Sequence, residues 1–211
     1  MDAHLRAGIA VYNAGGYHAA HDAWEERWLA LDRGGDGSDD ERFLHGLIQF
    51  TAAVHHATER NWAGATGLAE SAREYLGGLP ETYRGVNVAD AREYLAALGD
   101  DPELIERGPP PKLTHEARAL GLGDLDVAAC AVAAEVFAEA FEEFEAATIE
   151  RAVEYARADF DSGEATSAFV TLVCDFVREP ERRGLVYQRL REHTERRAAR
   201  DADVEGLFEE R

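Results

Sequence analysis

Lysine is almost absent from this chain of 211 residues, because its 22 basic residues are 21 arginines and the single Lys112. The 42 aspartates and glutamates outnumber them and give a formal net charge of -20. An acidic surface with almost no lysine is typical of a protein in a salt-rich cytoplasm, where carboxylates hold water and ions and salt screens their repulsion. The alternative is an acidic protein from a GC-rich genome, whose codons favour arginine. Of the two, we expect a halophilic protein.

Large positive regions are missing too. Residues 1–111 carry 19 acidic and 9 basic residues and residues 112–211 carry 23 and 13, so each half has a net charge of -10. Such an even negative charge argues against nucleic acid as a partner. One stretch differs, since residues 178–200 contain eight arginines and four glutamates. We interpret it as a solvated helix with mixed charges rather than as a nucleic-acid interface.

Sequence signatures of many compartments and enzyme classes are absent. The two cysteines, Cys130 and Cys174, lie among apolar residues without a CxxC or zinc-finger spacing, which indicates buried thiols in a reducing compartment. No uncharged apolar run reaches 18 residues and no basic leader precedes one, so we expect a cytoplasmic protein outside the membrane. The GxSxG, P-loop and dinucleotide-binding motifs are also missing.

Alternating strand patterns are missing, whereas helical periodicity runs through the chain. We therefore expect an all-α fold, a helical bundle or orthogonal helical array. A glycine turn within residues 12–20 predicts a hairpin of the kind found in tetratricopeptide repeats, although no repeat period is sustained. The apolar stretch 43–54 predicts a central buried helix, preceded by a loop at 33–38 and capped by Asp39 or Asp40.

Proline and glycine suggest how the chain is divided. Three prolines follow Gly108, and because proline cannot continue a helix we expect a linker over residues 108–123. This predicts an N-terminal helical domain at 1–107 and a C-terminal helical region at 124–211. The two parts are free to pack as one body.

A set of polar residues lies within the apolar helix faces and is the best candidate for a site. His21 and Glu25 are one helical turn apart, and Gln49 and His56 are two turns apart on the next long helix, with His45 one turn before Gln49. If these helices pack antiparallel, we expect the polar side chains to converge beside Trp24 or Trp28. His55 is expected to point to solvent instead.

This set has three interpretations. One is a site for a small ligand or a divalent transition metal, with His21, Glu25, His56 and His45 as candidate metal ligands. Only Glu25 and a neighbour such as Asp22 or Glu59 supply carboxylates, which is too few for a di-iron centre. Another is a buried hydrogen-bonded network in which Glu25 accepts from a histidine, Gln49 or an indole. The third is a chance grouping of surface residues.

Two motifs in the first 80 residues resemble a known family, the domain of unknown function numbered 309. The matching residues are Tyr12, Asn13, Gly16, Tyr17, Ala20, His21, Trp24, Glu25 and Trp28, then Phe43, Leu44, Gly46, Leu47, Ile48, Gln49, Ala53 and His56, then Asn61, Gly64 and Ala65. The resemblance covers about residues 4–80 and implies a compact helical domain without an established activity. It adds Tyr17 and Asn13 to the candidate cluster.

The chain departs from the family pattern at two positions. Asp22 stands where the family usually has glutamate, and His45 stands where it usually has glutamine. If a metal site exists, His45 extends the ligand set and Asp22 reaches less far. The part beyond residue 112 is similar to C-terminal extensions of halophilic members, which implies an archaeal source.

Two functions are consistent with these features. The first is a non-catalytic binding or scaffold module that takes a protein partner or a second copy of the chain. The second is a metal-dependent or acid–base enzyme of small substrates that uses His21, Glu25 and His56.

Overall fold

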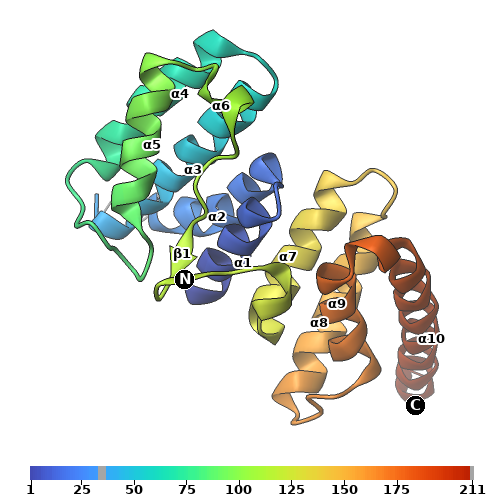
Figure 1. The fold of residues 1–211 in the computed structure, drawn as a ribbon. Helices are drawn as coiled ribbons and strands as arrows, with labels where there is room; N and C mark the ends of the chain where they lie inside the picture. The colour runs from blue at the N-terminus through green and yellow to red at the C-terminus, as the bar shows by residue number, and fades with distance from the viewer. Residues whose placement is uncertain (33–36, 210–211) are drawn as a thin grey trace. The chain divides into compact units, whose positions relative to one another are not determined.

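The computed structural model of the protein describes residues 1–32 and 37–209 (Figure 1). Within these residues it contains ten α-helices, two short 3-10 helices and one hairpin of two-residue strands, which confirms the expected all-α class. Residues 33–36 of the expected loop lie outside the described residues. The chain divides into two compact units, Met1–Leu125 and Asp126–Arg211.

The first unit is a series of helices in which each of the first five packs on the next along the chain (Figure 1). Their bounds are α1 Asp2–Asn13, α2 Tyr17–Asp32, α3 Asp39–Thr58, α4 Trp62–Leu76 and α5 Val88–Asp100, followed by the short α6 Leu104–Arg107. Gly15 has a φ of +93°, a left-handed conformation that glycine adopts without strain, and it forms the turn of the α1–α2 hairpin. The expected glycine turn is therefore present.

Side-chain caps set the beginnings of the two central helices. The hydroxyl of Ser38 accepts the backbone N–H of Glu41 at 3.2 Å, and the carboxamide oxygen of Asn61 accepts that of Gly64 at 3.1 Å. The N-cap of α3 is therefore Ser38, one residue before the expected Asp39 or Asp40, because a serine hydroxyl at this position already reaches the third helical N–H.

Helix α3 supplies the middle of the core, between α2 and α4. Its residues Phe43, Leu44, Leu47, Phe50 and Val54 are fully buried. The helix is not buried all round, because His45 and Gln49 are only half-buried. These two residues leave a polar stripe on an otherwise apolar helix.

Two glycines allow helices to approach closely in this core. A Cβ atom on Gly8 of α1 would lie 2.1 Å from Nε1 of Trp24, and one on Gly46 of α3 would lie 2.5 Å from Cδ2 of Leu76. Trp24 is fully buried and fills the space beside Gly8. The α1–α2 and α3–α4 contacts therefore depend on residues without a side chain.

The segment after α6 returns to α1 and completes the first unit. It contains strands β1 Thr114–His115 and β2 Arg118–Ala119, which pair antiparallel, and the 3-10 helix η1 Leu122–Asp124. The hydroxyl of Tyr12 donates to the carbonyl of Pro111 at 3.0 Å. The stretch expected to be a linker, residues 108–123, thus lies within the first unit, and the next unit starts at Asp126.

The second unit consists of four longer helices that pack on one another. They are α7 Val127–Ala140, α8 Ala146–Asp161, α9 Ala168–Arg178 and α10 Arg183–Glu209, with the 3-10 helix η2 Pro180–Arg182 before α10. Cys130 and Cys174 are buried in its core. Arg197 of α10 and Asp159 of α8 form an ion pair of 2.6 Å at the edge of this core.

In the described parts of both units, every helix falls short of the length or the apolarity needed to cross a membrane.

Candidate metal centre

Four polar residues form a stripe along α2, at positions 18, 21, 22 and 25. Residues three and four apart in a helix lie on the same face, so His18, His21, Asp22 and Glu25 neighbour one another. The helix buries Ala19, Ala20, Ala23 and Trp24 on its other side. The sequence of α2 therefore presents histidines and carboxylates together on its more accessible face.

Three members of this stripe place potential ligand atoms close together. One nitrogen of His21 and one oxygen each of Asp22 and Glu25 all lie within 4.8 Å of one another, and all three residues are half-buried. No other group of three or more His, Cys, Asp or Glu side chains in residues 1–32 and 37–209 meets this condition. We refer to His21, Asp22 and Glu25 as the α2 triad.

Hydrogen bonding orients the histidine of the triad. Nδ1 of His21 lies 2.9 Å from Oδ1 of Asp22, and about a quarter of each side chain is exposed. The pKa of His21 is raised above its usual value, mainly by this hydrogen bond and further by the negative charges of Asp22 and Glu25, although burial opposes the shift. The triad is thus an electronegative spot that favours a cation.

A second pair of histidines lies next to the triad. The ring of His18 is 6.1 Å from that of His21 and stacks on His55 of α3, with 5.3 Å between centroids and 19° between ring planes. His55 is therefore half-buried rather than directed to solvent, because packing of α2 on α3 covers one face of its ring. Burial and the neighbouring His18 and His56 lower its pKa.

Trp28, His45 and Gln49 belong to a different group, in which α2, α3 and α4 meet. The indole N–H of Trp28 donates to Oε1 of Glu41 at 2.8 Å, and the ring of His45 stacks on Tyr75 at 3.9 Å. Trp28 contacts the same histidine at 4.6 Å, and Nε2 of Gln49 lies 3.5 Å from Nε2 of His45. This aromatic group holds three helices together, which is the architectural role that one interpretation of the sequence gave to the whole cluster.

The remaining candidates of the cluster have structural contacts. The indole N–H of Trp24 points to the carbonyl of Leu5, 3.4 Å away, and the ring of Tyr17 packs 5.3 Å from that of Tyr12. The carboxamide of Asn13 bonds to the backbone of residues 113 and 120. None of these three residues is part of the α2 triad.

His56 lies at the end of α3 and contacts the cap of α4. The carboxamide Nδ2 of Asn61 lies 2.8 Å from Nδ1 of His56. The expected convergence of His21, Glu25, Gln49 and His56 is therefore divided: the structure groups His21 with Glu25, Gln49 with His45, and His56 with Asn61.

Sequence reasoning gave too little weight to Asp22 and omitted Glu41, Tyr75 and the stacking of His18 on His55. For Glu41, the signal available was its position four residues before His45, one helical turn. No spacing in the sequence predicts the contacts between helices, because those contacts depend on the packing of α2, α3 and α4.

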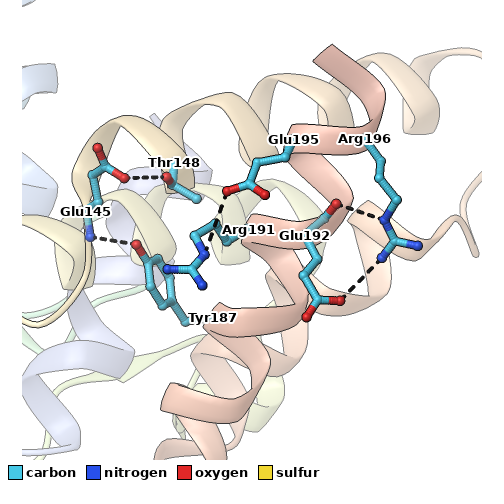
Figure 2. Close-up of polar contacts among 7 residues, drawn as sticks. All are labelled: Glu145, Thr148, Tyr187, Arg191, Glu192, Glu195 and Arg196. Carbon is cyan, nitrogen blue, oxygen red and sulfur yellow. Dashed lines mark hydrogen bonds and ion pairs between the residues drawn. The ribbon is translucent and has the colours of Figure 1, made fainter. Parts of the chain in front are cut away.

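In the arginine-rich stretch of the second unit, at least four of the eight arginines face a carboxylate. On α10, Arg191 lies 3.8 Å from Glu195 and Arg196 lies 3.5 Å from Glu192. Figure 2 shows these two pairs of side chains facing each other. Arg197 pairs with Asp159 of α8. This arrangement supports the interpretation of a solvated helix with mixed charges, because arginines that face carboxylates are poor sites for phosphate.

Comparison with known proteins finds similarity in the part that holds the triad. Residues 5–68 match the model of a domain of unknown function, DUF309. The match contains both motifs of the resemblance noted above. An uncharacterized protein of Aquifex aeolicus (strain VF5) is similar as well, with 25% identity over 115 residues, 54% of this chain and 32% of the relative. The chain thus spans about a third of the length of this curated relative.

Proposed function

We propose that the first unit is a binding module that holds a divalent transition-metal ion at the α2 triad. The observation that carries this proposal is the grouping of His21, Asp22 and Glu25 within 4.8 Å. One imidazole and two carboxylates suit Zn²⁺, Fe²⁺ or Mn²⁺ better than a hard ion such as Mg²⁺, which keeps most of its water.

The geometry of the triad is compatible with such an ion after a small adjustment. Ligand atoms about 2.0–2.2 Å from an ion are roughly 3–3.5 Å from one another, so the widest separation in the triad has to shrink. Rotation of half-exposed side chains on one helix achieves this without moving the backbone. Three protein ligands leave at least one coordination position for water, a ligand or the nearby His18.

The experiment that tests this function is a titration of chelator-treated protein with Zn²⁺, Mn²⁺ and Mg²⁺, followed by calorimetry and thermal unfolding. We expect about one Zn²⁺ per chain, and a 100-fold excess of ion over its Kd should stabilise the fold by about 2.7 kcal/mol. Elemental analysis of protein purified without chelator provides a separate measurement of the natural ion.

Two neighbouring glutamates provide a matched pair of variants. Glu25→Gln should abolish Zn²⁺ binding, whereas Glu26→Gln on the same helix should retain it because Glu26 is highly exposed and outside the triad. His21→Gln should behave like Glu25→Gln, and His193→Gln in the second unit like the wild type. The proposal would be excluded if both variants of a pair lost Zn²⁺ binding equally, or if the wild type did not bind Zn²⁺.

Acid–base catalysis is a second candidate function, favoured by the 2.9 Å contact between His21 and Asp22. A carboxylate that holds an imidazole in one orientation is the arrangement of many general bases. A hydrolase screen of metal-free protein separates the two functions. Turnover that His21→Gln removes, in the absence of metal, would favour catalysis over binding.

We further propose that the protein works in the salt-rich cytoplasm of an archaeon, that residues 126–209 form a C-terminal extension, and that the chain takes a protein partner or a second copy of itself. The single lysine and the net charge of -20 support the salt-rich environment. Size-exclusion chromatography with light scattering in KCl tests the second copy, since a monomer at all concentrations would leave only a different protein as partner.

A further inference from the structure

A second candidate binding region lies in the first unit, outside the triad and the aromatic group. A pocket of about 560 Å³ is bounded by α5, α6 and the proline segment that follows α6. This volume is within the range of small-molecule sites, roughly 300–1,000 Å³. Tyr94, Leu104, Pro109 and Pro111 supply apolar surface to its walls.

The proline wall of this pocket is held in place before any ligand arrives. Proline fixes its own backbone torsion, and the carbonyl of Pro111 accepts a hydrogen bond of 3.0 Å from Tyr12 in α1. Pro110, between the two lining prolines, is buried. A preformed wall lowers the entropy cost of binding.

Tyr94 contributes both an aromatic ring and an unmatched polar atom. Its ring meets Phe50 edge-on, with centroids 6.4 Å apart, and its hydroxyl is buried without a hydrogen-bond partner among the described residues. Burial raises the pKa of this hydroxyl to about 12, so it stays protonated. Unpaired buried hydroxyls are uncommon in proteins because each one loses its bonds to water.

The charges around the pocket are unbalanced toward negative. Asp90 and Glu93 line it, together with Arg107, whose Nη2 is 2.6 Å from Oδ2 of Asp101. Because Asp101 neutralises that arginine, the two carboxylates determine the sign of the potential. The face of an aromatic ring such as that of Tyr94 also attracts cations.

We propose that this pocket binds a small organic cation, with an ammonium group near Asp90 and Glu93 and an apolar body between Tyr94, Leu104 and the prolines. An anion of the same shape is repelled by both carboxylates and by the net charge of the protein. The site is independent of the metal proposed for the α2 triad.

Calorimetric titration of the full chain with 2-phenylethylammonium and with 3-phenylpropionate, at one fixed KCl concentration, tests this proposal. The two probes share a phenyl ring and differ in the sign of their charge. We expect saturable binding of the cation and at least about tenfold weaker binding of the anion. Equal affinities, or no saturable binding of the cation, would overturn the proposal.

Three variants locate the bound probe. Glu93→Gln should weaken binding of the cation several-fold and leave the folded structure intact, because this side chain is exposed. Tyr94→Phe keeps the ring and removes the unmatched hydroxyl, so it should retain cation binding with an unchanged or higher melting temperature. Glu81→Gln, exposed and outside the pocket, is the matched control for charge. If Glu81→Gln weakens binding as much as Glu93→Gln, the cation is attracted by overall charge and the pocket assignment fails.

Discussion

The side chain of Asn13 fastens two distant parts of the first unit to each other. Its Nδ2 donates to the carbonyls of Leu113 at 2.8 Å and Leu120 at 2.9 Å, and its Oδ1 accepts the N–H of Leu113 at 3.0 Å. The only lysine of the chain, Lys112, bonds to the backbone carbonyl of the same asparagine at the end of α1. A positive charge at this end of a helix is also favoured by the helix dipole.

Replacing Asn13 should therefore be costly. We expect Asn13→Ala to lower the free energy of unfolding by about 2–3 kcal/mol, because three hydrogen bonds are lost and backbone groups are left unpaired. Asn61→Ala, which removes a helix cap instead, should cost only about 1 kcal/mol. Urea denaturation measures both. If the two variants lost equal amounts of unfolding free energy, Asn13 would be no more than a local helix cap.

The pH dependence of stability should reveal the environment of His21. In metal-free protein its pKa is raised, so its contribution to stability is complete below the unfolded-state value of 6.5 and is lost as the pH rises through the folded-state value. We expect the stability difference between wild type and His21→Gln to shrink as the pH rises from below 6.5 through the raised folded-state pKa. Urea denaturation at a series of pH values measures this difference, and a difference that stays constant with pH would contradict the hydrogen bond to Asp22.

The contribution of His4 to stability should change with pH in the opposite direction, so His4 serves as the control. Burial lowers its pKa despite the nearby Glu26, so its contribution is complete above 6.5 and is lost as the pH falls through the folded-state value. The difference between wild type and His4→Gln should therefore grow as the pH rises. If the stability differences of the His21→Gln and His4→Gln variants from wild type change in the same direction with pH, the environments of these two histidines are wrongly assigned.

Among the described glycines, Gly8 at the contact between α1 and α2 leaves the least space for an added methyl group. Gly8→Ala should destabilise the protein by about 2–4 kcal/mol, because the new methyl group collides with the buried Trp24. Gly67→Ala on α4 has nothing within 4 Å and should instead stabilise it by roughly 0.5–1 kcal/mol, since alanine is the better helix former. Thermal unfolding of the two variants gives the signs directly.

The sequence was a good guide to elements that depend on local chemistry. Glycine marked the turn between α1 and α2, and the periods of apolar residues predicted the helices. The prolines of residues 108–123 predicted a linker from local chemistry alone. The hydrogen bonds that hold this segment come from Tyr12 and Asn13, about 100 residues earlier in the chain.

The same limit applies to the candidate site. The neighbours His21 and Glu25 were predictable because they lie one turn apart on one helix. The acceptor for Trp28 was not, since Glu41 reaches it only after α2 and α3 have packed. Predicting which residues share a helix face was possible, but predicting which faces meet required the structure.

At the scale of the molecule, negative charge is divided evenly between the units. Residues 1–125 and 126–211 each contain 21 acidic and 11 basic residues, a net charge of -10. Compact structures with such self-repulsion gain stability when salt screens it.

We therefore expect the free energy of unfolding to rise with KCl concentration, in the full chain and in the fragment of residues 1–125. Urea denaturation at several KCl concentrations measures the slope. A parallel series in sorbitol of equal osmolality separates screening from exclusion of solute. Stability that is independent of salt would argue that the acidic composition reflects codon usage.

The return of residues 108–125 to α1 has a consequence for synthesis on the ribosome. Tyr12 and Asn13 are translated well before their bonding partners, which lie 99 to 107 residues later in the chain. The N-terminal helices can pair as they emerge, but α1 stays incompletely bonded until Leu120 has left the exit tunnel. A pause in translation before that point would hold the nascent chain in a state that chaperones bind and proteases cut.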